Sequence, residues 1–317
     1  MTGPAERSEG IPEVVVVGVA SRDLAADDPR GWRLGGGVTY AALALARLGV
    51  RTGAVMGVDP LAARAAELDL LRVSGVDLRL VELGQGPVFE NVETPDGRVQ
   101  YARSVSDRVP AGALPGSWRS APGWMIAPVA GEVDDAWADV IPDGSLVGLG
   151  WQGLLRELVT TGPVRRLPPG PSSLLARADV VGVSRDDLDP NLDLADLCRL
   201  LRPGADLIVT KGRRGGLAME VGPDGPGRLR HYGIVPSARI VDPTGAGDSF
   251  LAGVVAARLM PRLVGGRTSG GWDLRLGAVL ASLVVEGPGL AGVPERPAII
   301  ARLRSSLAPP KDVDRGA

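Results

Sequence analysis

The alternation of short β-branched runs with segments rich in alanine and leucine restricts the fold of this sequence most. Residues 13–20 form a valine-rich run without polar alternation, as expected of a central strand in a parallel sheet. Segments 38–48 and 60–74 carry alanine and leucine at helical spacing, and the apolar run 51–57 lies between them. Such alternation predicts βαβ units, and therefore an α/β fold of three layers with helices on both faces of a mostly parallel central sheet.

The same pattern continues toward the C-terminus. Further strands are expected at 77–81, 124–127, 145–149, 178–183 and 207–210, helices at 132–140, 272–285 and 298–307, and a β-hairpin at 218–221 and 230–234. With 317 residues and 44% hydrophobic composition, the chain suits one large domain. We place this domain at residues 11–307 and expect flexible tails at 1–10 and 308–317.

One junction predicts chemistry as well as structure. Residues 238–241 are expected to end a strand, residues 251–260 to form a helix, and the turn between them contains Gly245 and Gly247. The free N–H groups and the positive end of the helix dipole at such a turn can hold an anion. Asp248 follows directly, and a carboxylate beside a bound phosphate is repulsive unless it takes a proton from an attacking hydroxyl. An anion cradle with a base is typical of phosphoryl transfer, although the turn could also be only a tight strand-to-helix connection.

The whole string Asp-Pro-Thr-Gly-Ala-Gly-Asp-Ser-Phe at 242–250 resembles the C-terminal signature of the PfkB, or ribokinase-like, family of small-molecule kinases. The resemblance covers nearly the whole chain and implies a ribokinase-like fold, ATP as phosphoryl donor and Mg²⁺ as cofactor. It also implies an anion hole formed by Gly245, Ala246, Gly247 and the amide of Asp248, with Asp248 as the catalytic base.

Gly35 and Gly36 begin a stretch that resembles the N-terminal signature of the same family, in which two glycines let a sugar approach the backbone. Asp23, just after the first strand, matches an aspartate that commonly binds sugar hydroxyls, and Ser21 lies beside it. By itself, Asp23 would be only a carboxylate at the end of a loop. The family usually has an asparagine where this sequence has Tyr40, so the resemblance leaves the identity of the substrate open.

A glycine-rich turn after the strand at 207–210 is similar to the nucleotide loop of the family. The candidate donor-binding residues there are Thr210, Lys211, Gly212 and Gly215. Without the family likeness, this turn would be merely a connection between two elements of secondary structure.

The metal ligands are less sharply indicated. Many family members carry Asn-x-x-Glu near the magnesium and phosphate region, and the corresponding residues here are Ser184 and Asp187. Asp187 keeps a carboxylate for Mg²⁺, whereas Ser184 could equally cap the next helix. Asp242 and the backbone of Thr244 are candidates for binding a monovalent cation such as K⁺.

A β lid over the substrate is a further expectation from the family. Alternating residues at 88–101 surround an Asp96-Gly97 turn and predict one hairpin, so we place a small lid at about 79–101. The segment 24–34 is expected to be too short for a second hairpin. The lid should therefore be reduced, and a homodimer, if formed, should not use a full lid.

Composition excludes several classes of function. A net charge of −2 and a pI of about 5.6 do not indicate the excess of basic residues that binding to nucleic acid or a membrane surface requires. Cys198 and His231 are the single cysteine and histidine, which excludes disulfides, Cys/His zinc sites and Ser-His-Asp triads. No signal segment or membrane-spanning apolar run occurs in the sequence, so a cytoplasmic location is expected.

Several functions stay open at this stage, and the first is phosphorylation of a sugar or polyol by ATP. Nucleoside or myo-inositol kinases of the same fold and a non-catalytic sugar sensor are alternatives. The string at 148–153 fits the dinucleotide template Gly-x-Gly-x-x-Gly, but Gly162 and Pro163 would cut its helix short, so we reject a NAD-binding oxidoreductase. A P-loop enzyme is excluded because its signature does not occur in the sequence.

Overall fold

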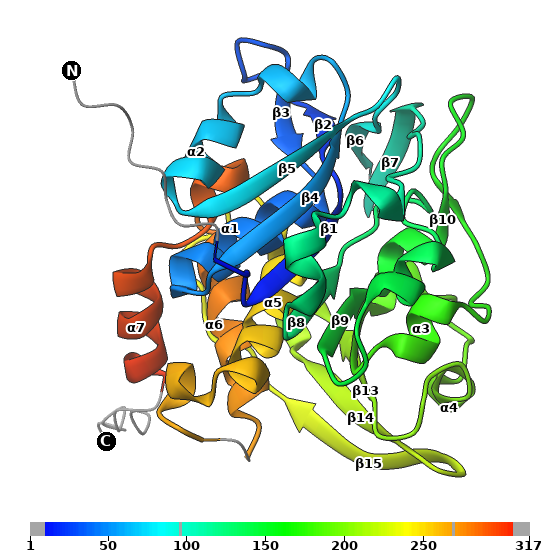
Figure 1. Ribbon diagram of the computed structural model, residues 1–317, viewed down its shortest axis with the longest axis vertical. Coiled ribbons are helices and arrows are strands. Elements are labelled where there is room, and N and C mark those ends of the chain that lie inside the picture. The colour runs from blue at the N-terminus through cyan, green and yellow to red at the C-terminus, as the bar shows by residue number, and fades with distance from the viewer. Residues whose placement is uncertain (1–9, 95–96, 268–269, 307–317) are drawn as a thin grey trace, which may run out of the picture.

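The computed structural model describes residues 10–94, 97–267 and 270–306, and the predicted tails 1–10 and 308–317 lie almost entirely outside them. Its centre is a nine-stranded sheet (Figure 1). In spatial order its strands are β15 (Gly225–Tyr232), β14 (Gly216–Gly222), β13 (Asp206–Thr210), β12 (Val180–Ser184), β9 (Leu146–Gly150), β8 (Gly123–Ile126), β1 (Val14–Val19), β4 (Thr52–Val58) and β5 (Val76–Glu82). All pairs from β13 to β5 are parallel, whereas β14 and β15 are antiparallel, so the predicted mostly parallel sheet is confirmed.

Helices cover both faces of this sheet. One face shares a hydrophobic core with α1 (Gly37–Leu48), α2 (Glu67–Val73), α5 (Ala246–Leu259), α6 (Trp272–Val284) and α7 (Arg296–Ser305), and the other with α3 (Ser173–Arg177) and α4 (Leu194–Cys198). The valines of β1 show why both faces must be covered. Val14 and Val16 belong to one core and Val15 and Val17 to the other, because successive side chains of a strand point to opposite faces.

Short 3-10 segments connect many of these elements. They span Ala62–Arg64, Ala111–Ala113, Gly116–Ser120, Asp135–Val140, Trp151–Leu154, Arg185–Asp187, Gly212–Arg214, Pro261–Val264 and Gly289–Gly292. The segment after β9 is one of them, so an α-helix does not follow the glycine string at 148–153. This agrees with the rejection of the dinucleotide template. None of the helices in the described part of the chain has the length and apolar character needed to traverse a lipid bilayer.

Three predicted elements differ in the structure. The helix expected at 132–140 is only a 3-10 segment. The helix expected at 60–74 is divided, because Ala65 adopts an extended conformation between a 3-10 turn and α2. The strand expected at 238–241 is absent: the N–H of Val241 donates to the carbonyl of Val285 at the end of α6, at 2.7 Å, instead of joining a sheet.

A separate four-stranded sheet, here called the outer sheet, lies beyond the ends of the central strands. It contains β3 (Trp32–Gly35), β2 (Ser21–Leu24), β6 (Val88–Thr94) and β7 (Gly97–Ser104), in this order. The prediction that 24–34 is too short for a second hairpin was wrong. The hairpin strands begin outside that segment, so that Ser21 pairs with Gly35 and Leu24 with Trp32.

The single hairpin predicted at about 79–101 is also corrected in its bounds. Residues 79–82 belong to β5 of the central sheet, and the hairpin itself is formed by β6 and β7. Asp96 of the predicted Asp96-Gly97 turn lies outside the described residues, as does Pro95. Because the outer sheet has four strands, the argument that a reduced lid prevents lid-mediated dimerisation no longer holds.

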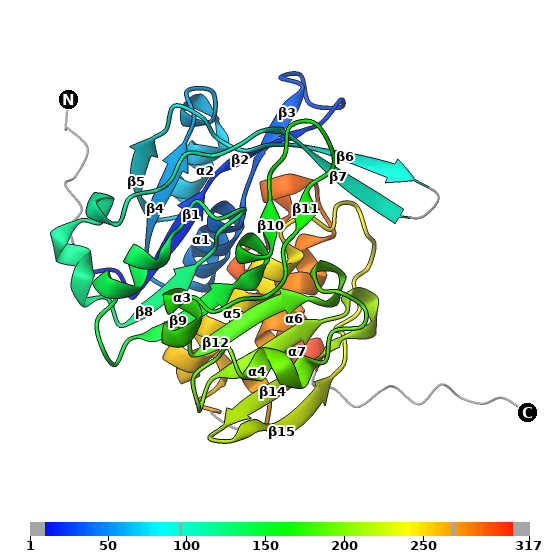
Figure 2. The same cartoon turned by 90° about the vertical axis from the view of Figure 1, so that its right-hand side faces the viewer.

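A second small feature, here called the arm, consists of residues 156–166. Its strands β10 (Arg156–Glu157) and β11 (Arg165–Arg166) are antiparallel. The arm joins the outer sheet through a bridge between Tyr101 and Pro163 and a hydrogen bond of 2.8 Å from Val164 N–H to Gln100 O. Figure 2 shows β6 and β7 extending from the body of the molecule, with β10 and β11 beside them.

Candidate active site

A cavity of about 850 Å³ opens where the outer sheet, the arm and the N-termini of α1 and α5 meet. Most sequence-predicted site residues line it: Ser21, Asp23, Gly36, Tyr40, Asp187, Thr210, Gly212, Thr244, Gly245, Ala246, Gly247 and Asp248. The remaining ones, Gly35, Lys211, Gly215 and Asp242, are not part of its lining. Distant segments converge here because the carboxyl ends of parallel strands share one edge of the sheet.

The turn at residues 245–248, here called the anion-binding turn after its predicted role, begins α5 and forms the floor of this cavity. Gly245 is the N-cap and has φ 76°, a left-handed conformation that favours glycine. A Cβ at this position would lie 2.1 Å from Cδ1 of Tyr40, so a side chain is excluded on steric grounds as well. A Cβ on Gly247 would meet no described atom within 4 Å, which leaves the space beside its backbone open. The turn therefore offers helix N-terminal amides to an open volume, as an anion site requires.

Tyr40 lies between the two helix starts. It belongs to the first turn of α1, which begins after Gly36 with φ 96°, and its side chain is 2% exposed. Burial raises the pKa of Tyr40 well above its usual value, and the negative charges of Asp23, Asp242 and Asp248 act in the same direction. The phenol is therefore neutral at physiological pH and packs against the backbone of the anion-binding turn.

Ser21 and Asp23, both on β2, form a second polar group in the cavity lining. The hydroxyl of Ser21 donates to Oδ1 of Asp23 at 2.9 Å. A Cβ on Gly35 would lie 2.2 Å from Oδ2 of Asp23, so Gly35 makes room for this carboxylate although it does not line the cavity. Ser21 and Asp23 offer hydroxyl and carboxylate oxygens, which suit recognition of ligand hydroxyl groups.

The carboxylate of Asp248 is strongly perturbed by its surroundings. It is partly exposed, and its Oδ1 would lie 2.6 Å from a Cβ on Gly37, so it rests against the start of α1. Burial raises the pKa of Asp248 to about 6; the positive charge of Arg156 acts against this rise, and the negative charge of Asp187 adds to it. A carboxylate with such a pKa is mostly ionised at neutral pH and is a stronger base than an ordinary aspartate.

Arg156 connects the two sides of the cavity. Its Nη2 donates to Oδ1 of Asp187 at 2.9 Å, and its Nη1 donates to Oε1 of Gln100 on β7 at 3.0 Å. The amide of Gln152 donates to both oxygens of Asp187, at 3.1 and 3.0 Å. Ser184 accepts a hydrogen bond from the N–H of Asp186, which confirms the capping role considered for it.

The predicted donor loop is divided by the structure. Thr210 and Gly212 line the cavity, whereas Lys211 and Gly215 do not. Lys211 N–H donates to the carbonyl of Gly215 at 2.7 Å, and a Cβ on Gly215 would lie 2.1 Å from the carbonyl oxygen of Tyr232. Lys211 and Gly215 thus close the turn and allow β15 to approach it, and their direct contact with a donor stays a prediction.

Of the predicted metal ligands, Asp242 has a structural role in the loops around the cavity. Asp242 accepts hydrogen bonds from the N–H groups of Thr244, at 2.9 Å, and Gly289, at 3.1 Å, and so fixes the anion-binding turn to the loop after α6. Within the described ranges, no three His, Cys, Asp or Glu side chains gather in a way that could hold a metal ion. Mg²⁺ that is held mainly by phosphates and water needs only one or two carboxylates, so Asp187 still fits such an ion.

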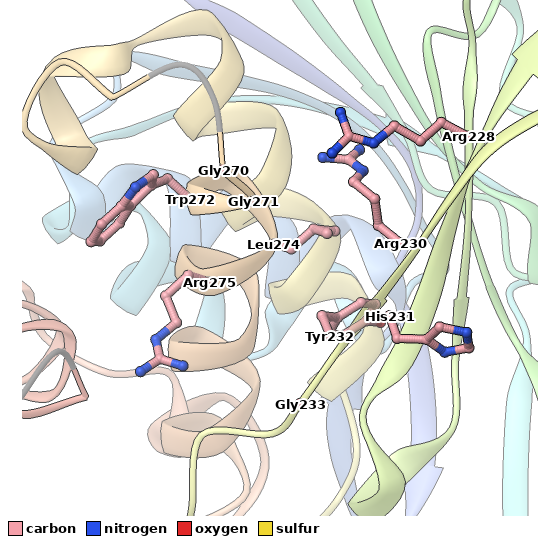
Figure 3. A pocket seen from close by; sticks show the side chains of 10 residues that line it. All are labelled: Arg228, Arg230, His231, Tyr232, Gly233, Gly270, Gly271, Trp272, Leu274 and Arg275. Carbon is pink, nitrogen blue, oxygen red and sulfur yellow. The ribbon is translucent and has the colours of Figure 1, made fainter. Parts of the chain in front are cut away.

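A second cavity, of about 500 Å³, lies between the edge strand β15 and the start of α6 (Figure 3). Its arginines already have partners: Arg230 pairs with Asp206 at 3.4 Å, and Nε of Arg275 donates to the hydroxyl of Ser306 at 3.0 Å. His231 is an exposed residue of β15, and in the close-up its imidazole lies on the opposite side of the strand from Tyr232. The described residues of its lining include no carboxylate, so we assign the chemistry to the larger cavity.

Sequence reasoning missed the residues that the arm and the outer sheet contribute. Phe89, Asn91, Gln100 and Arg156 all line the larger cavity. The alternation in β6 predicts that Phe89 and Asn91 share a face, so this pair could have been proposed from the sequence. Nothing in the sequence indicates that Arg156 faces Asp187, because that contact depends on how the arm pairs with β7.

The comparisons with known proteins agree with this geometry. Residues 167–296, which contain the anion-binding turn, match the family profile described as "pfkB family carbohydrate kinase". A search of curated proteins found no significant match.

Solved structures match nearly the whole chain. A pyrophosphate-dependent kinase of the ribokinase family, complexed with a pyrophosphate analogue and myo-inositol, shares 18% identity at a TM-score of 0.70, covering 91% of this chain and 99% of its own. Ribokinase from Arabidopsis thaliana, complexed with ribose and ATP, shares 20% identity at 0.66, covering 92% and 99%. A nucleoside kinase from Methanocaldococcus jannaschii shares 18% identity at 0.64, covering 93% and 99%. At these identities the likeness establishes the fold.

Proposed function

The chain belongs to the pfkB family of carbohydrate kinases and has the ribokinase-family fold, and we propose that it phosphorylates a hydroxyl of a sugar or polyol with ATP. As a member of this family it is a phosphotransferase that acts on an alcohol group. The observation that carries the proposal is the position of Asp248. A carboxylate with its pKa raised to about 6 lies next to the open amides of a helix start, in the same cavity as Ser21 and Asp23.

In the proposed reaction, Asp248 accepts the proton of the acceptor hydroxyl while the hydroxyl oxygen forms its bond to phosphorus. The amides of Gly245, Ala246, Gly247 and Asp248 stabilise the charge that develops on the transferred phosphoryl oxygens. The helix dipole of α5 adds to this stabilisation, since the turn forms the N-terminus of a 14-residue helix.

When bound, Mg²⁺ would neutralise the donor phosphates and hold them in line with the acceptor. We propose Asp187 as the protein carboxylate beside this ion. Since Arg156 and Gln152 already donate hydrogen bonds to Asp187, coordination through a water molecule suits its surroundings better than direct contact. Asp242 and the backbone of Thr244 remain our candidates for binding a monovalent cation such as K⁺.

The acceptor end favours a compact polyhydroxy substrate. Asp23 and Ser21 can accept hydrogen bonds from substrate hydroxyls, and Tyr40 brings a neutral aromatic ring close to the anion-binding turn. A ring in place of the amide that the family usually has there narrows the cavity. We therefore propose a flat acceptor, such as an inositol or a nucleoside, as the alternative to a hexose or pentose, and we expect weak activity on ribose.

Pyrophosphate is the second candidate donor. Of the three structures quoted above, the Arabidopsis thaliana ribokinase is described as complexed with ATP, whereas the one with a TM-score of 0.70 is described as pyrophosphate-dependent. Ser184, Thr210 and Thr244 in the cavity lining carry hydroxyl groups, which can donate hydrogen bonds to the phosphate oxygens of either donor.

A phosphorylation screen tests these proposals. The purified chain would be incubated with pentoses, hexoses, inositols and nucleosides, each with ATP or pyrophosphate and with Mg²⁺, and the products would be identified by mass spectrometry. We expect one acceptor class to gain a phosphoryl group with one of the donors. If no acceptor is phosphorylated by either donor at millimolar concentrations, the proposed function is wrong.

A further inference from the structure

The charge of the larger cavity poses a problem for phosphate binding, and this inference rests on the phosphoryl transfer proposed above. Its described lining has four carboxylates and two guanidiniums, which belong to Asp23, Asp186, Asp187, Asp248, Arg156 and Arg166. A polyphosphate donor adds several further negative charges. The amides of the anion-binding turn offset part of this charge, so the placement of each guanidinium becomes important.

Of the two arginines, Arg156 is the one that is held in place. Its side chain is 18% exposed and is fixed by hydrogen bonds to Asp187 and Gln100, whereas Arg166 is an exposed residue. A guanidinium has five N–H donors, and two of those in Arg156 are used by these partners. The others remain for a ligand in the cavity that Arg156 and Asp248 both line.

We propose that Arg156 is a catalytic residue that donates hydrogen bonds to the phosphoryl group during its transfer. The planar fork of a guanidinium matches two phosphate oxygens at once. In the transfer, the bond between phosphorus and the acceptor oxygen forms, the bond to the donor oxygen breaks, and the acceptor proton moves to Asp248. Arg156 keeps all its protons and stabilises the charge on the equatorial oxygens.

Asp187 has a positioning role in this arrangement. Its carboxylate is 11% exposed and accepts hydrogen bonds from both Arg156 and Gln152, so it fixes the direction of the guanidinium. An arginine that only tied the arm to the central domain would need these same contacts but no phosphate. The phosphate-binding role and the purely structural role of Arg156 predict different donor affinities and turnover for Arg156 variants that still fold.

Donor binding separates the two roles without knowledge of the acceptor. Calorimetric titrations with pyrophosphate and with ATP, each with Mg²⁺, would compare wild type, Arg156→Gln and Arg156→Lys. The control is Arg165→Gln, which lies on the arm, is exposed, and pairs only with the exposed Glu157 in the described part of the chain. We expect Arg156→Gln to weaken donor binding about 10-fold or more, since hydrogen bonds between charged groups are stronger than those between neutral groups. Arg156→Lys should be intermediate, and Arg165→Gln unchanged.

Turnover provides the second measurement once an acceptor is known. Arg156→Gln should lower kcat by about 10²–10³, as loss of a donor to a developing oxyanion does. Guanidinium ions added to Arg156→Ala should restore part of the lost rate, which a purely structural role would not allow. Thermal melts check that each variant is folded.

Two results would overturn the inference. One is donor affinity and turnover of Arg156→Gln within about twofold of Arg165→Gln; the other is loss of rate in Arg156→Ala without any rescue and with unchanged donor binding. These outcomes differ from a failure of the proposed function, in which wild type would bind neither donor and phosphorylate no acceptor.

Discussion

The two walls of the larger cavity are built in different ways. The inner wall consists of the starts of α1 and α5, where Gly36 and Gly245 set the backbone and Asp248 follows within a few residues. The outer wall consists of the outer sheet and the arm, which meet through pairings between distant segments, such as Tyr101 with Pro163. Local sequence thus specifies the anion-binding turn and the base. The charged groups that face them across the cavity, Arg156 and Asp187, are brought there by tertiary pairing.

The largest effect is expected at the inner wall, from Asp248→Asn. Asparagine keeps the size of the side chain and the turn, but it cannot accept the acceptor proton. Loss of a general base typically lowers the rate by about 10²–10⁴, while donor affinity should stay within a few-fold because the amides are unchanged. Steady-state kinetics and calorimetry measure the two quantities, with the exposed Asp139→Asn as the control. If Asp248→Asn keeps more than about a tenth of the wild-type kcat, Asp248 is not the base.

The pH dependence of the reaction should follow the same carboxylate. Since burial raises the pKa of Asp248 to about 6, its base form is lost below that pH, and kcat/KM should fall about tenfold per pH unit there. The groups that face Asp248 are Arg156, Asp187 and Tyr40, and of these Tyr40 stays neutral over this range. A flat pH–rate profile between pH 5 and about 7 would argue against this assignment.

The raised pKa of Asp248 also affects the free energy of unfolding. A carboxylate in an ion pair stabilises the fold at high pH, whereas a carboxylate with a raised pKa does so at low pH. The folded chain binds a proton at Asp248 more tightly than the unfolded chain. At pH values between the ordinary pKa of aspartate and about 6, Asp248 is therefore protonated mainly in the folded state. Stability from this group is therefore greatest at low pH and is lost as pH rises through 6. Asp248→Asn should remove this loss, so denaturant unfolding should find it more stable than wild type near pH 7 but not near pH 4.

A smaller effect distinguishes the two glycines of the anion-binding turn. Gly245→Ala should destabilise the fold by about 1–3 kcal/mol, because it places a side chain at positive φ and against the ring of Tyr40. Gly247→Ala meets no described atom, so its stability should be close to wild type. Donor binding should still weaken in Gly247→Ala, since its Cβ would enter the open space beside the turn. Equal melting temperatures for the two variants would contradict this difference.

This contrast explains how much of the molecule could be predicted from sequence. The parallel sheet, the turn before α5 and the position of Tyr40 follow from local patterns that need no knowledge of distant partners. The sequence does not reveal the second hairpin of the outer sheet. Its strands β2 and β3 begin at Ser21 and end at Gly35, so they include residues that the sequence places outside the segment 24–34. The strand expected at 238–241 does not form for a related reason. The apolar character of a segment does not determine its hydrogen-bond partner, and the N–H of Val241 donates to the carbonyl of Val285 at the end of α6 instead.

The smallest effect is expected at the outer wall, from Gln100→Leu. Leucine removes the acceptor that holds Nη1 of Arg156 at 3.0 Å, but it leaves the bond from Arg156 to Asp187 intact. We expect kcat to fall about 3- to 10-fold. This is less than the loss expected on removing a fully buried hydrogen bond to a charged group, because Gln100 is partly exposed. The control is Glu90→Gln, which removes an exposed ion pair with Arg103 on the same outer sheet. If Gln100 acts through Arg156, Gln100→Leu should have no further effect on kcat in an Arg156→Gln background, whereas additive losses would show that the outer wall acts on the substrate independently.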